Sequence, residues 1–249
     1  QERAKKHRVV QAEPLAIGRC AVIGAGVMGA GVAYWVSNRG HEVVLRDVND
    51  QALAKGMKSI TKNYEDAHRK HVLTDHQMAR GLDRIFPTSA PAPLDRCDLV
   101  IEAAVERLDI KKKIFADLSA RTRPDTILAT NTSALPIREL ADVVEHPERL
   151  VGLHFFNPVH RMPLVEVVRS QKTSDTVLAT AVAFVRSLGK LPVVVQDSPG
   201  FLVNRILMPY LVEAARIFEQ GGDPQAIDNA MLDFGMPMGA LRLLDEVGL

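Results

Sequence analysis

Cysteine is scarce in this chain of 249 residues, and neither sign of charge is in excess. The 2 cysteines, Cys20 and Cys97, each begin an apolar run, which is typical of buried, reduced thiols and speaks against a disulfide framework. The 31 Lys and Arg residues against 30 Asp and Glu leave a net charge of +1, which gives no basis for a nucleic-acid-binding surface. No apolar run of about 18 residues is present, so we expect no membrane insertion.

The ends of the chain lack the features that usually close a domain. Residues 1–14 are charged and contain no apolar segment like that of a signal peptide, so residues 1–19 are interpreted as a connector. Residues 241–249 keep helical apolar spacing and stop without a polar tail. We therefore expect a fragment of a longer protein. Its expected compartment is the bacterial cytoplasm, or the mitochondrial matrix or peroxisome if the source is eukaryotic.

Apolar residues, in contrast, make up 47% of the chain and recur as short β-branched runs with helical segments between them. The runs lie at residues 21–23, 42–46, 99–101, 126–129, 150–153, 164–168 and 192–195. This alternation predicts an α/β protein with a Rossmann-type, doubly wound, mostly parallel sheet. The run at 164–168 follows its predecessor so closely that an antiparallel strand is the alternative there.

The pattern changes after Ser198-Pro199-Gly200. Apolar residues return at spacings of three and four over residues 201–220, which predicts a helix, and a second helix is predicted over residues 224–234. The predicted domain boundary therefore falls near residue 199. It separates a Rossmann domain at 20–199 from the start of an all-helical C-terminal domain at 200–249.

Three glycines follow the first predicted strand directly. Gly24, Gly26 and Gly29 are spaced as in a dinucleotide-binding turn, where side chains would keep backbone amides away from a pyrophosphate. Asp47 lies 18 residues after Gly29, at the end of the second strand, where a carboxylate binds the ribose hydroxyl of NAD and repels the 2'-phosphate of NADP. Strand alternation predicts that the neighbouring Arg46 points the other way.

Polar residues follow two later strands, at the sheet edge where open α/β sheets bind ligands. Asn131 to Ser133 follow one strand, and His154 lies at the end of the next. Glu166 lies within an otherwise apolar strand, where an unpaired carboxylate is costly. We expect Glu166 to orient His154 for acid/base chemistry. The alternatives are a structural histidine and a solvent-facing glutamate on an edge strand.

Two further clusters have simpler explanations. His68, His71 and His76 lie on a polar helix and loop, so no metal site is predicted there. Lys55, Lys58 and Lys62 share a helix face that would either meet the phosphates of CoA or be solvated. The sequence alone does not favour one reading of these lysines over the other.

Several strings, taken in order and spacing, resemble the 3-hydroxyacyl-CoA dehydrogenase family over roughly residues 20 to 249. They are residues 23–31, 102–106, 131–133, 154–158, 163–166, 197–205 and 237–239. The segment 154–163 looks more like the bacterial multifunctional β-oxidation α subunit than the short monofunctional enzyme. One departure is Ala240, which stands where the family pattern usually has proline.

The resemblance implies an NAD-dependent oxidation of L-3-hydroxyacyl-CoA to 3-ketoacyl-CoA in fatty acid β-oxidation. It implies that His154 is the general base and Glu166 its orienting partner. Asn204 would hold the substrate near its thioester and keto oxygens, and Ser133 would contact both the substrate hydroxyl and the cofactor. The implied NAD-binding residues are Gly24, Gly26, Met28, Gly29, Asp47, Ala104, Val105, Glu106, Lys111, Ser133 and Asn157. Without the resemblance, Glu106 and Lys111 would be interpreted as a solvated helix start.

The same resemblance implies partners and alternatives. An acyl-CoA substrate and a homo-oligomer are expected, with residues 200–249 belonging to a substrate-binding and dimerisation domain. A longer parent would carry an enoyl-CoA hydratase domain upstream and bind a thiolase subunit. The alternatives are an NAD-binding module that is inactive or truncated, and a 3-hydroxybutyryl-CoA dehydrogenase or related 3-hydroxy acid enzyme.

Overall fold

The computed structural model describes residues 12–91 and 94–247. Contacts divide the described chain into two compact units, one that ends at Ser198 and one that begins at Pro199. Residues 1–11 of the predicted connector, and residues 248 and 249 at the other end, lie outside the described residues. None of the described helices is long and apolar enough to cross a membrane.

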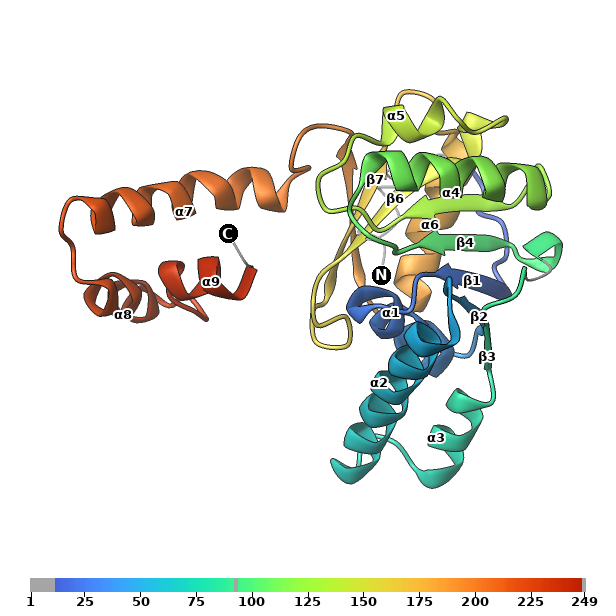
Figure 1. The fold of residues 1–249 in the computed structure, drawn as a ribbon, viewed down its shortest axis with the longest axis horizontal. Coiled ribbons are helices and arrows are strands. Elements are labelled where there is room, and N and C mark those ends of the chain that lie inside the picture. Colours follow the sequence, from blue (N-terminus) through green and yellow to red (C-terminus); the bar gives the residue numbers. More distant parts are fainter. Residues whose placement is uncertain (1–11, 92–93, 248–249) are drawn as a thin grey trace, which may run out of the picture. The chain divides into compact units, whose positions relative to one another are not determined.

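The first unit is built on one sheet of eight strands, in the order β3-β2-β1-β4-β5-β6-β7-β8 (Figure 1). Its strands are β1 (Arg19–Ile23), β2 (Glu42–Arg46), β3 (Ile85–Thr88), β4 (Leu99–Glu102), β5 (Ile127–Thr130), β6 (Leu150–Phe155), β7 (Leu164–Arg169) and β8 (Leu191–Gln196). The first six run parallel to one another, which confirms the predicted doubly wound sheet.

The last two strands reverse direction. β7 pairs antiparallel with β6, and β8 runs parallel to β7. The short connection from residue 156 to residue 163 leaves no room for a crossover helix, which a parallel pair needs. The alternative noted for residues 164–168 is therefore the one that the structure adopts.

One strand, β3, was absent from the predicted set. It is four residues long, contains Pro87 and lies at the edge of the sheet beside β2. Proline cannot donate a ladder hydrogen bond and is tolerated in sheets mainly at such edges. A short run interrupted by proline gives little periodic signal, so the sequence pattern did not reveal it.

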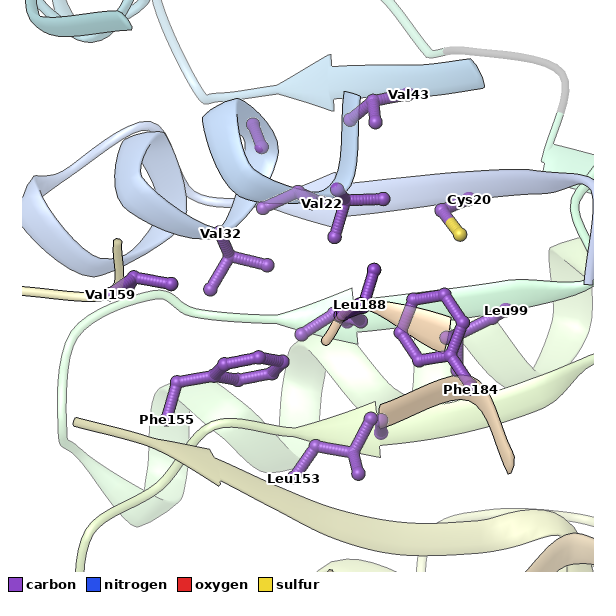
Figure 2. Packing of buried hydrophobic residues seen from close by; sticks show 14 of the residues in the cluster. Cys20, Val22, Val32, Val43, Leu99, Leu153, Phe155, Val159, Phe184 and Leu188 are labelled. Carbon is purple, nitrogen blue, oxygen red and sulfur yellow. The ribbon is translucent and has the colours of Figure 1, made fainter. Parts of the chain in front are cut away.

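Helices cover both faces of the sheet. In the first unit they are α1 (Val27–Asn38), α2 (Asp50–Arg69), α3 (Asp75–Leu82), α4 (Leu108–Arg121), α5 (Ile137–Ala141) and α6 (Asp175–Ser187). Val151 and Leu153 on β6 belong to a core cluster with residues of α1, α2 and α6, part of which Figure 2 shows. Gly152 between them faces Ile137 of α5 on the opposite side. Successive side chains of a strand point to opposite faces of the sheet, and helices cover both faces, so the sheet has one apolar core on each face.

The start of α1 differs from the starts of neighbouring helices. Side chains of Asn49, Thr74 and Ser174 accept hydrogen bonds from the first turns of α2, α3 and α6. The N-cap of α1 is Gly26, which offers no side-chain acceptor, and the first turn carries no acidic residue. The first amides and the positive dipole end of α1 are therefore available to an anionic ligand.

The second unit consists of α7 (Val203–Glu219), α8 (Pro224–Phe234) and α9 (Ala240–Val247). Leu211, Ala214 and Ala240 form its small buried core. Asp228 accepts a hydrogen bond of 2.8 Å from the amide of Leu241, which joins α8 to the start of α9. The helices expected over 201–220 and 224–234 are both present.

Candidate active site

The glycine turn between β1 and α1 is too crowded for side chains at two of its positions. Gly24 has a φ of 104°, and a Cβ there would approach the carbonyl oxygen of Ala103 to 2.6 Å. A Cβ on Gly29 would collide with the carbonyl oxygen of Gly24. The amide of Gly24 donates a hydrogen bond of 2.7 Å to the Arg46 carbonyl, which fixes the turn against the end of β2.

Gly26 has a different environment. A Cβ at this position would meet no protein atom within 4 Å, so glycine is not required by packing. Gly26 and Met28 instead line a cleft of about 940 Å³ at the carboxyl ends of the parallel strands. A side chain at Gly26 would occupy the space through which a pyrophosphate reaches the first amides of α1.

Asp47 braces the same turn from the end of β2. Its carboxylate accepts hydrogen bonds of 2.6 Å from the amides of Ala25 and Val48. Asp47 lines the cleft, as the NAD prediction requires. Arg46 also contributes to the lining, but its side chain turns to α4, where it forms an ion pair of 3.5 Å with Asp117. It thus points away from the glycine turn that Asp47 contacts, as strand alternation predicts.

His154 and Glu166 face each other across the antiparallel pair of β6 and β7. Nδ1 of His154 lies 2.7 Å from a carboxylate oxygen of Glu166. Glu166 is fully buried, which excludes the alternative of a solvent-facing glutamate, and His154 is 6% exposed and lines the cleft. Because Nδ1 carries the contact with Glu166, proton exchange with a bound molecule falls to Nε2.

The surroundings of His154 hold the ring in place. The Phe156 ring lies 4.4 Å from the imidazole centroid and is tilted by 48°. Asn131, at the end of β5, accepts a hydrogen bond of 2.9 Å from the Phe155 amide and so links the ends of β5 and β6. Asn131 and Phe156 both line the cleft.

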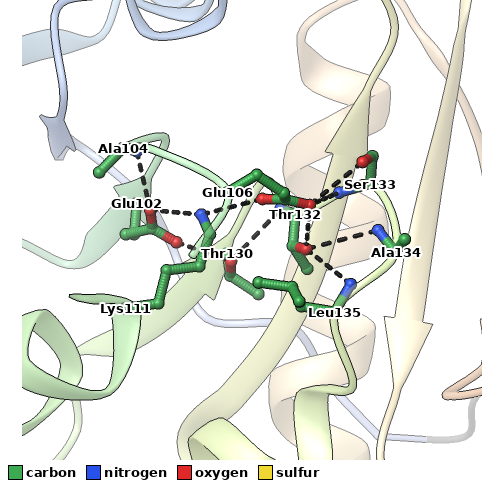
Figure 3. A network of polar contacts seen from close by, with 9 residues as sticks. All are labelled: Glu102, Ala104, Glu106, Lys111, Thr130, Thr132, Ser133, Ala134 and Leu135. Atoms are coloured by element: carbon green, nitrogen blue, oxygen red, sulfur yellow. Dashed lines mark hydrogen bonds and ion pairs between the residues drawn. The ribbon is translucent and has the colours of Figure 1, made fainter. Parts of the chain in front are cut away.

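A buried ion pair lies beneath the loop that follows β4 (Figure 3). Lys111 Nζ is 2.6 Å from a carboxylate oxygen of Glu102, and both side chains are almost completely buried. Glu102 also accepts hydrogen bonds of 2.7 Å from the Ala104 amide and the Thr130 hydroxyl. Lys111 therefore does not lie on a solvated helix start, and the interpretation based on its sequence alone is wrong.

Glu106 connects this pair to the end of β5. One carboxylate oxygen accepts hydrogen bonds from the Thr132 hydroxyl at 2.6 Å and from the Ser133 amide at 2.7 Å, and the other lies 3.4 Å from Lys111 Nζ. Burial alone would raise the pKa of Glu106, but these hydrogen bonds and the Lys111 charge outweigh it and lower the pKa below 4.5. Glu106 is thus held as a carboxylate beside Ser133.

Comparison with known protein families identifies the family of this chain. Residues 19–198 match the model of the 3-hydroxyacyl-CoA dehydrogenase NAD binding domain, and residues 200–249 match that of the 3-hydroxyacyl-CoA dehydrogenase C-terminal domain. This chain belongs to the 3-hydroxyacyl-CoA dehydrogenase family. It is thus a member of a family of NAD-dependent oxidoreductases.

Solved structures of this family are closely similar. FadB2 from M. tuberculosis has 39% identity and a TM-score of 0.91, with 94% of this chain and 83% of that chain covered. A 3-hydroxybutyryl-CoA dehydrogenase from Escherichia coli has 41% identity and a TM-score of 0.90, with coverage of 94% and 50%. The (S)-3-hydroxybutyryl-CoA dehydrogenase PaaH1 from Ralstonia eutropha has 39% identity and a TM-score of 0.90, with coverage of 93% and 83%.

The residues of this dehydrogenase-family chain fit NAD. The open face of Gly26 admits a pyrophosphate, and Asp47 places a carboxylate where an adenosine ribose would lie. Among the described residues, no group of three or more His, Cys, Asp or Glu side chains is arranged to hold a metal ion. His68, considered above for a metal site, is 3.0 Å from Asp75.

Most of the site residues expected for the dehydrogenase line one cleft, namely Gly24, Gly26, Met28, Asp47, Ala104, Val105, Glu106, Ser133, His154 and Asn157. Gly29, Lys111 and Glu166 stand behind this lining and support it through the contacts described above. Asn204 is the second residue of α7, in the other unit, and its role stays a prediction.

Two residues have clear places in the site without a role predicted for them. Glu102 is the last residue of β4 and anchors Lys111. Asn131, expected only at the ligand-binding edge of the sheet, links the ends of β5 and β6. Both occur in strings that carry the family resemblance. A carboxylate that ends a fully apolar strand, as Glu102 does after Leu99-Val-Ile101, was a signal available in the sequence.

Proposed function

We propose that this chain oxidises the 3-hydroxyl of an L-3-hydroxyacyl-CoA to a ketone, with NAD as hydride acceptor, as a step of fatty acid β-oxidation. The observation that carries the proposal is the buried His154–Glu166 pair, whose imidazole opens onto the same cleft as the glycine turn. A cofactor site and an acid/base pair in one cleft are what an alcohol oxidation requires.

The protein's part in the reaction is proton removal and positioning. Nε2 of His154 takes the proton of the 3-hydroxyl as the carbon–oxygen double bond forms at C3. The imidazolium that results is stabilised by the Glu166 carboxylate at Nδ1, which also fixes the tautomer needed at the start. NAD, when bound, supplies the acceptor for the hydride that leaves C3.

The remaining roles concern orientation. Ser133 would contact the substrate hydroxyl and the cofactor, and its contact with Glu106 holds it at the end of β5. Glu106 and Asn157 would line the nicotinamide side, with Lys111 placed behind Glu106 by its buried pair with Glu102. Asn204 would bind the thioester and keto oxygens, a role that rests on the family resemblance.

We also propose an acyl-CoA as the substrate and a homo-oligomer as the working form. Apolar side chains on α7 and α8, including Ile206 at 66% exposure and Phe234 at 80%, support association through the second unit. Membership of a multifunctional complex with a thiolase subunit is a further proposal, supported only by the resemblance of residues 154–163.

A short-chain substrate, 3-hydroxybutyryl-CoA, is a second candidate. Two of the similar structures described above are 3-hydroxybutyryl-CoA dehydrogenases, at 39% and 41% identity. An inactive NAD-binding module is the remaining alternative, and the intact His154–Glu166 pair argues against it. Comparing turnover of acetoacetyl-CoA with that of a 3-ketodecanoyl-CoA would separate a short-chain enzyme from one with broad chain-length preference.

The test of the proposed reaction is NADH oxidation with acetoacetyl-CoA by the wild type, His154→Gln and His146→Gln. His146 is a half-exposed histidine paired with Glu148, so its replacement is a matched control. We expect kcat to fall about 10²–10⁴-fold in His154→Gln and to be unchanged in the control. NADH binding, followed by fluorescence, should be equal in all three proteins.

The outcomes separate the alternatives. A wild type that binds NADH but turns over neither acyl-CoA would favour the inactive module. If His154→Gln keeps the wild-type kcat, His154 is not the general base, although the family and the cofactor would be unaffected by that result. Turnover of acetoacetyl-CoA alone would favour the short-chain candidate.

A further inference from the structure

Lys190 is a buried lysine that the proposed reaction does not use. It lies directly before β8 and is only 7% exposed. Its ammonium donates hydrogen bonds to two backbone carbonyls, of Val159 at 2.6 Å and of Met162 at 2.7 Å. Both carbonyls belong to the connection between β6 and β7, which begins immediately after His154 and Phe155.

The connection is a tight turn whose carbonyls converge on this lysine. The amides of Arg161 and Met162 both donate to the carbonyl of Pro158, at 3.0 and 3.1 Å. A cation at the C-terminal end of such a turn satisfies carbonyls that have no partner within the turn. Asn157, which lines the cleft, immediately precedes this turn. The hydrogen bonds from Lys190 therefore hold the segment that carries Asn157.

Helix α1 packs against the same segment. Val159 is buried in the cluster that Figure 2 shows, and a Cβ on Gly31 of α1 would lie 3.0 Å from its side chain. Trp35 of α1 lies beneath Lys190, whose Nζ is 4.5 Å from the ring centroid, and Trp35 donates a hydrogen bond of 3.0 Å to the Leu188 carbonyl. Lys190 therefore joins the connection to the helix whose N-terminus faces the cleft.

We propose that Lys190 is a positioning residue of this dehydrogenase, whose ammonium holds residues 157–162 against α1 and so fixes His154 and Asn157 relative to the pyrophosphate-binding turn. The proposal rests on the proposed function for its effect on turnover. A misplacement of about 1 Å can cost an enzyme about 10²-fold in rate, so a brace of this kind acts on kcat without touching the substrate.

The charges around Lys190 make this brace sensitive to pH. Burial, assisted by the charge of Arg39 at the C-terminal end of α1, lowers the pKa of Lys190 from 10.5 to about 8. The guanidinium carbon of Arg39 lies 4.5 Å from the centroid of the same Trp35 ring. His160, on the connection itself, also faces this cluster, and burial together with neighbouring cations lowers its pKa below 6.5. Lys190 is thus the group that changes charge here between pH 7 and 9.

Deprotonation has opposite expected effects on activity and on stability. The neutral amine keeps two donors but loses the charge that strengthens both hydrogen bonds and the contact with Trp35. Turnover should therefore fall as the pH rises through about 8. Because the folded-state pKa is lowered, the unfolded state binds more protons between about 8 and 10.5, so Lys190's own contribution to stability rises over that window. With a purely structural lysine, turnover would depend on pH in the same way in the wild type and in Lys190→Arg.

The experiment compares Lys190→Met and Lys190→Arg with Lys172→Met, which removes an exposed lysine paired with Asp142. NADH oxidation with acetoacetyl-CoA is measured from pH 6.5 to 9.5. In Lys190→Met we expect kcat to fall roughly 10–100-fold with KM for NADH within about threefold of wild type. Lys190→Arg should restore most of the turnover and decline less steeply than the wild type above pH 8, because arginine keeps its charge. The decline that remains comes from the proton that NADH oxidation consumes, and it is common to all variants. The control should match the wild type.

A readout that does not need turnover comes from Trp35, the one tryptophan of the chain. Its fluorescence should titrate near pH 8 in the wild type and stay flat in both Lys190 variants. Other buried groups titrate elsewhere, because burial raises the pKa of Tyr64 to about 12 and that of Cys97 to about 11. Amide exchange of residues 157–163 should be faster in Lys190→Met than in the wild type and in Lys190→Arg.

The two proposals fail in different ways. If the wild type turns over neither acetoacetyl-CoA nor 3-ketodecanoyl-CoA, the proposed reaction is wrong, and faster amide exchange in Lys190→Met still supports the role of Lys190 in holding the connection. If the wild type is active and Lys190→Met keeps its kcat and pH profile, the positioning role is overturned. It is also overturned if kcat falls only in proportion to lost folded protein, or if amide exchange of the connection is unchanged.

Discussion

The two ends of the cleft hold their charges in different ways. Towards His154, the carboxylates of Glu102 and Glu166 are fully buried, and each is paired at 2.6 or 2.7 Å. Towards Asp47, the Arg46–Asp117 pair is 3.5 Å apart, with Arg46 24% and Asp117 49% exposed. Buried charges are costly to separate, whereas exposed ones are screened by water. The first end should therefore be sensitive to each side chain, whereas the second should tolerate replacement of Arg46 or Asp117 with little loss of stability.

The largest expected effect follows from breaking the buried pair. Lys111→Met leaves the Glu102 carboxylate buried without its cation, which should lower the free energy of unfolding by about 3–5 kcal/mol. Lys112→Met is the matched control, because Lys112 is partly exposed and 3.4 Å from Glu139, and it should cost no more than about 1 kcal/mol. Urea unfolding measures both. Equal losses would contradict the contrast between buried and exposed charges.

Glu166→Gln should affect turnover most among changes that preserve shape. The amide can still accept a hydrogen bond from His154, but it cannot stabilise the imidazolium, so kcat should fall about 10²-fold or more. Glu148→Gln, at a half-exposed glutamate beside His146, serves as the control. An unchanged kcat in Glu166→Gln would show that the pair is structural.

At the adenosine end, Asp47→Asn should change cofactor preference and keep the contact with the glycine turn, because the amide oxygen can still accept the hydrogen bond from the Ala25 amide. The amide removes the charge that repels a 2'-phosphate, and Arg46 lines the same part of the cleft. We expect the ratio of NADPH to NADH affinity to rise by roughly 10-fold, measured by fluorescence titration. If the ratio stays constant, Asp47 does not discriminate between the cofactors.

The smallest expected effect concerns Glu106, which lies between the two ends. Its pKa is lowered in the folded state, so it stabilises the fold above about pH 4.5, and this contribution is lost as the pH falls through the lowered value. Glu106→Gln should make the acid destabilisation between roughly pH 5 and 3 shallower than in the wild type. Thermal unfolding of the cofactor-free protein across this range would show it, and parallel curves would contradict it.

Local pattern was enough to predict the framework of the first unit. Strand, glycine turn and helix are adjacent in sequence from residue 21 to residue 46, so their geometry follows from short-range rules. The contact of His154 with Glu166 was also accessible, because a carboxylate in an apolar strand demands a partner and the two strands are consecutive.

The features that the sequence pattern did not predict depend on contacts between segments that are distant in the sequence. Lys111 is followed by two further lysines, so its surroundings in the sequence are those of a solvated helix, and only the end of β4 makes it buried. The brace by Lys190 joins segments some 30 residues apart through backbone carbonyls, which leave no trace in side-chain pattern.

The contact of Asp47 with the Ala25 amide bears on attempts to redesign cofactor use. The same carboxylate that selects against a 2'-phosphate also holds the glycine turn in shape. A substitution such as Asp47→Ser opens room for the 2'-phosphate but removes the acceptor of the Ala25 amide. The glycine turn would then be held less firmly, and binding of the pyrophosphate, which NAD and NADP share, would weaken. A successful redesign must supply a new acceptor for the Ala25 amide along with the new charge.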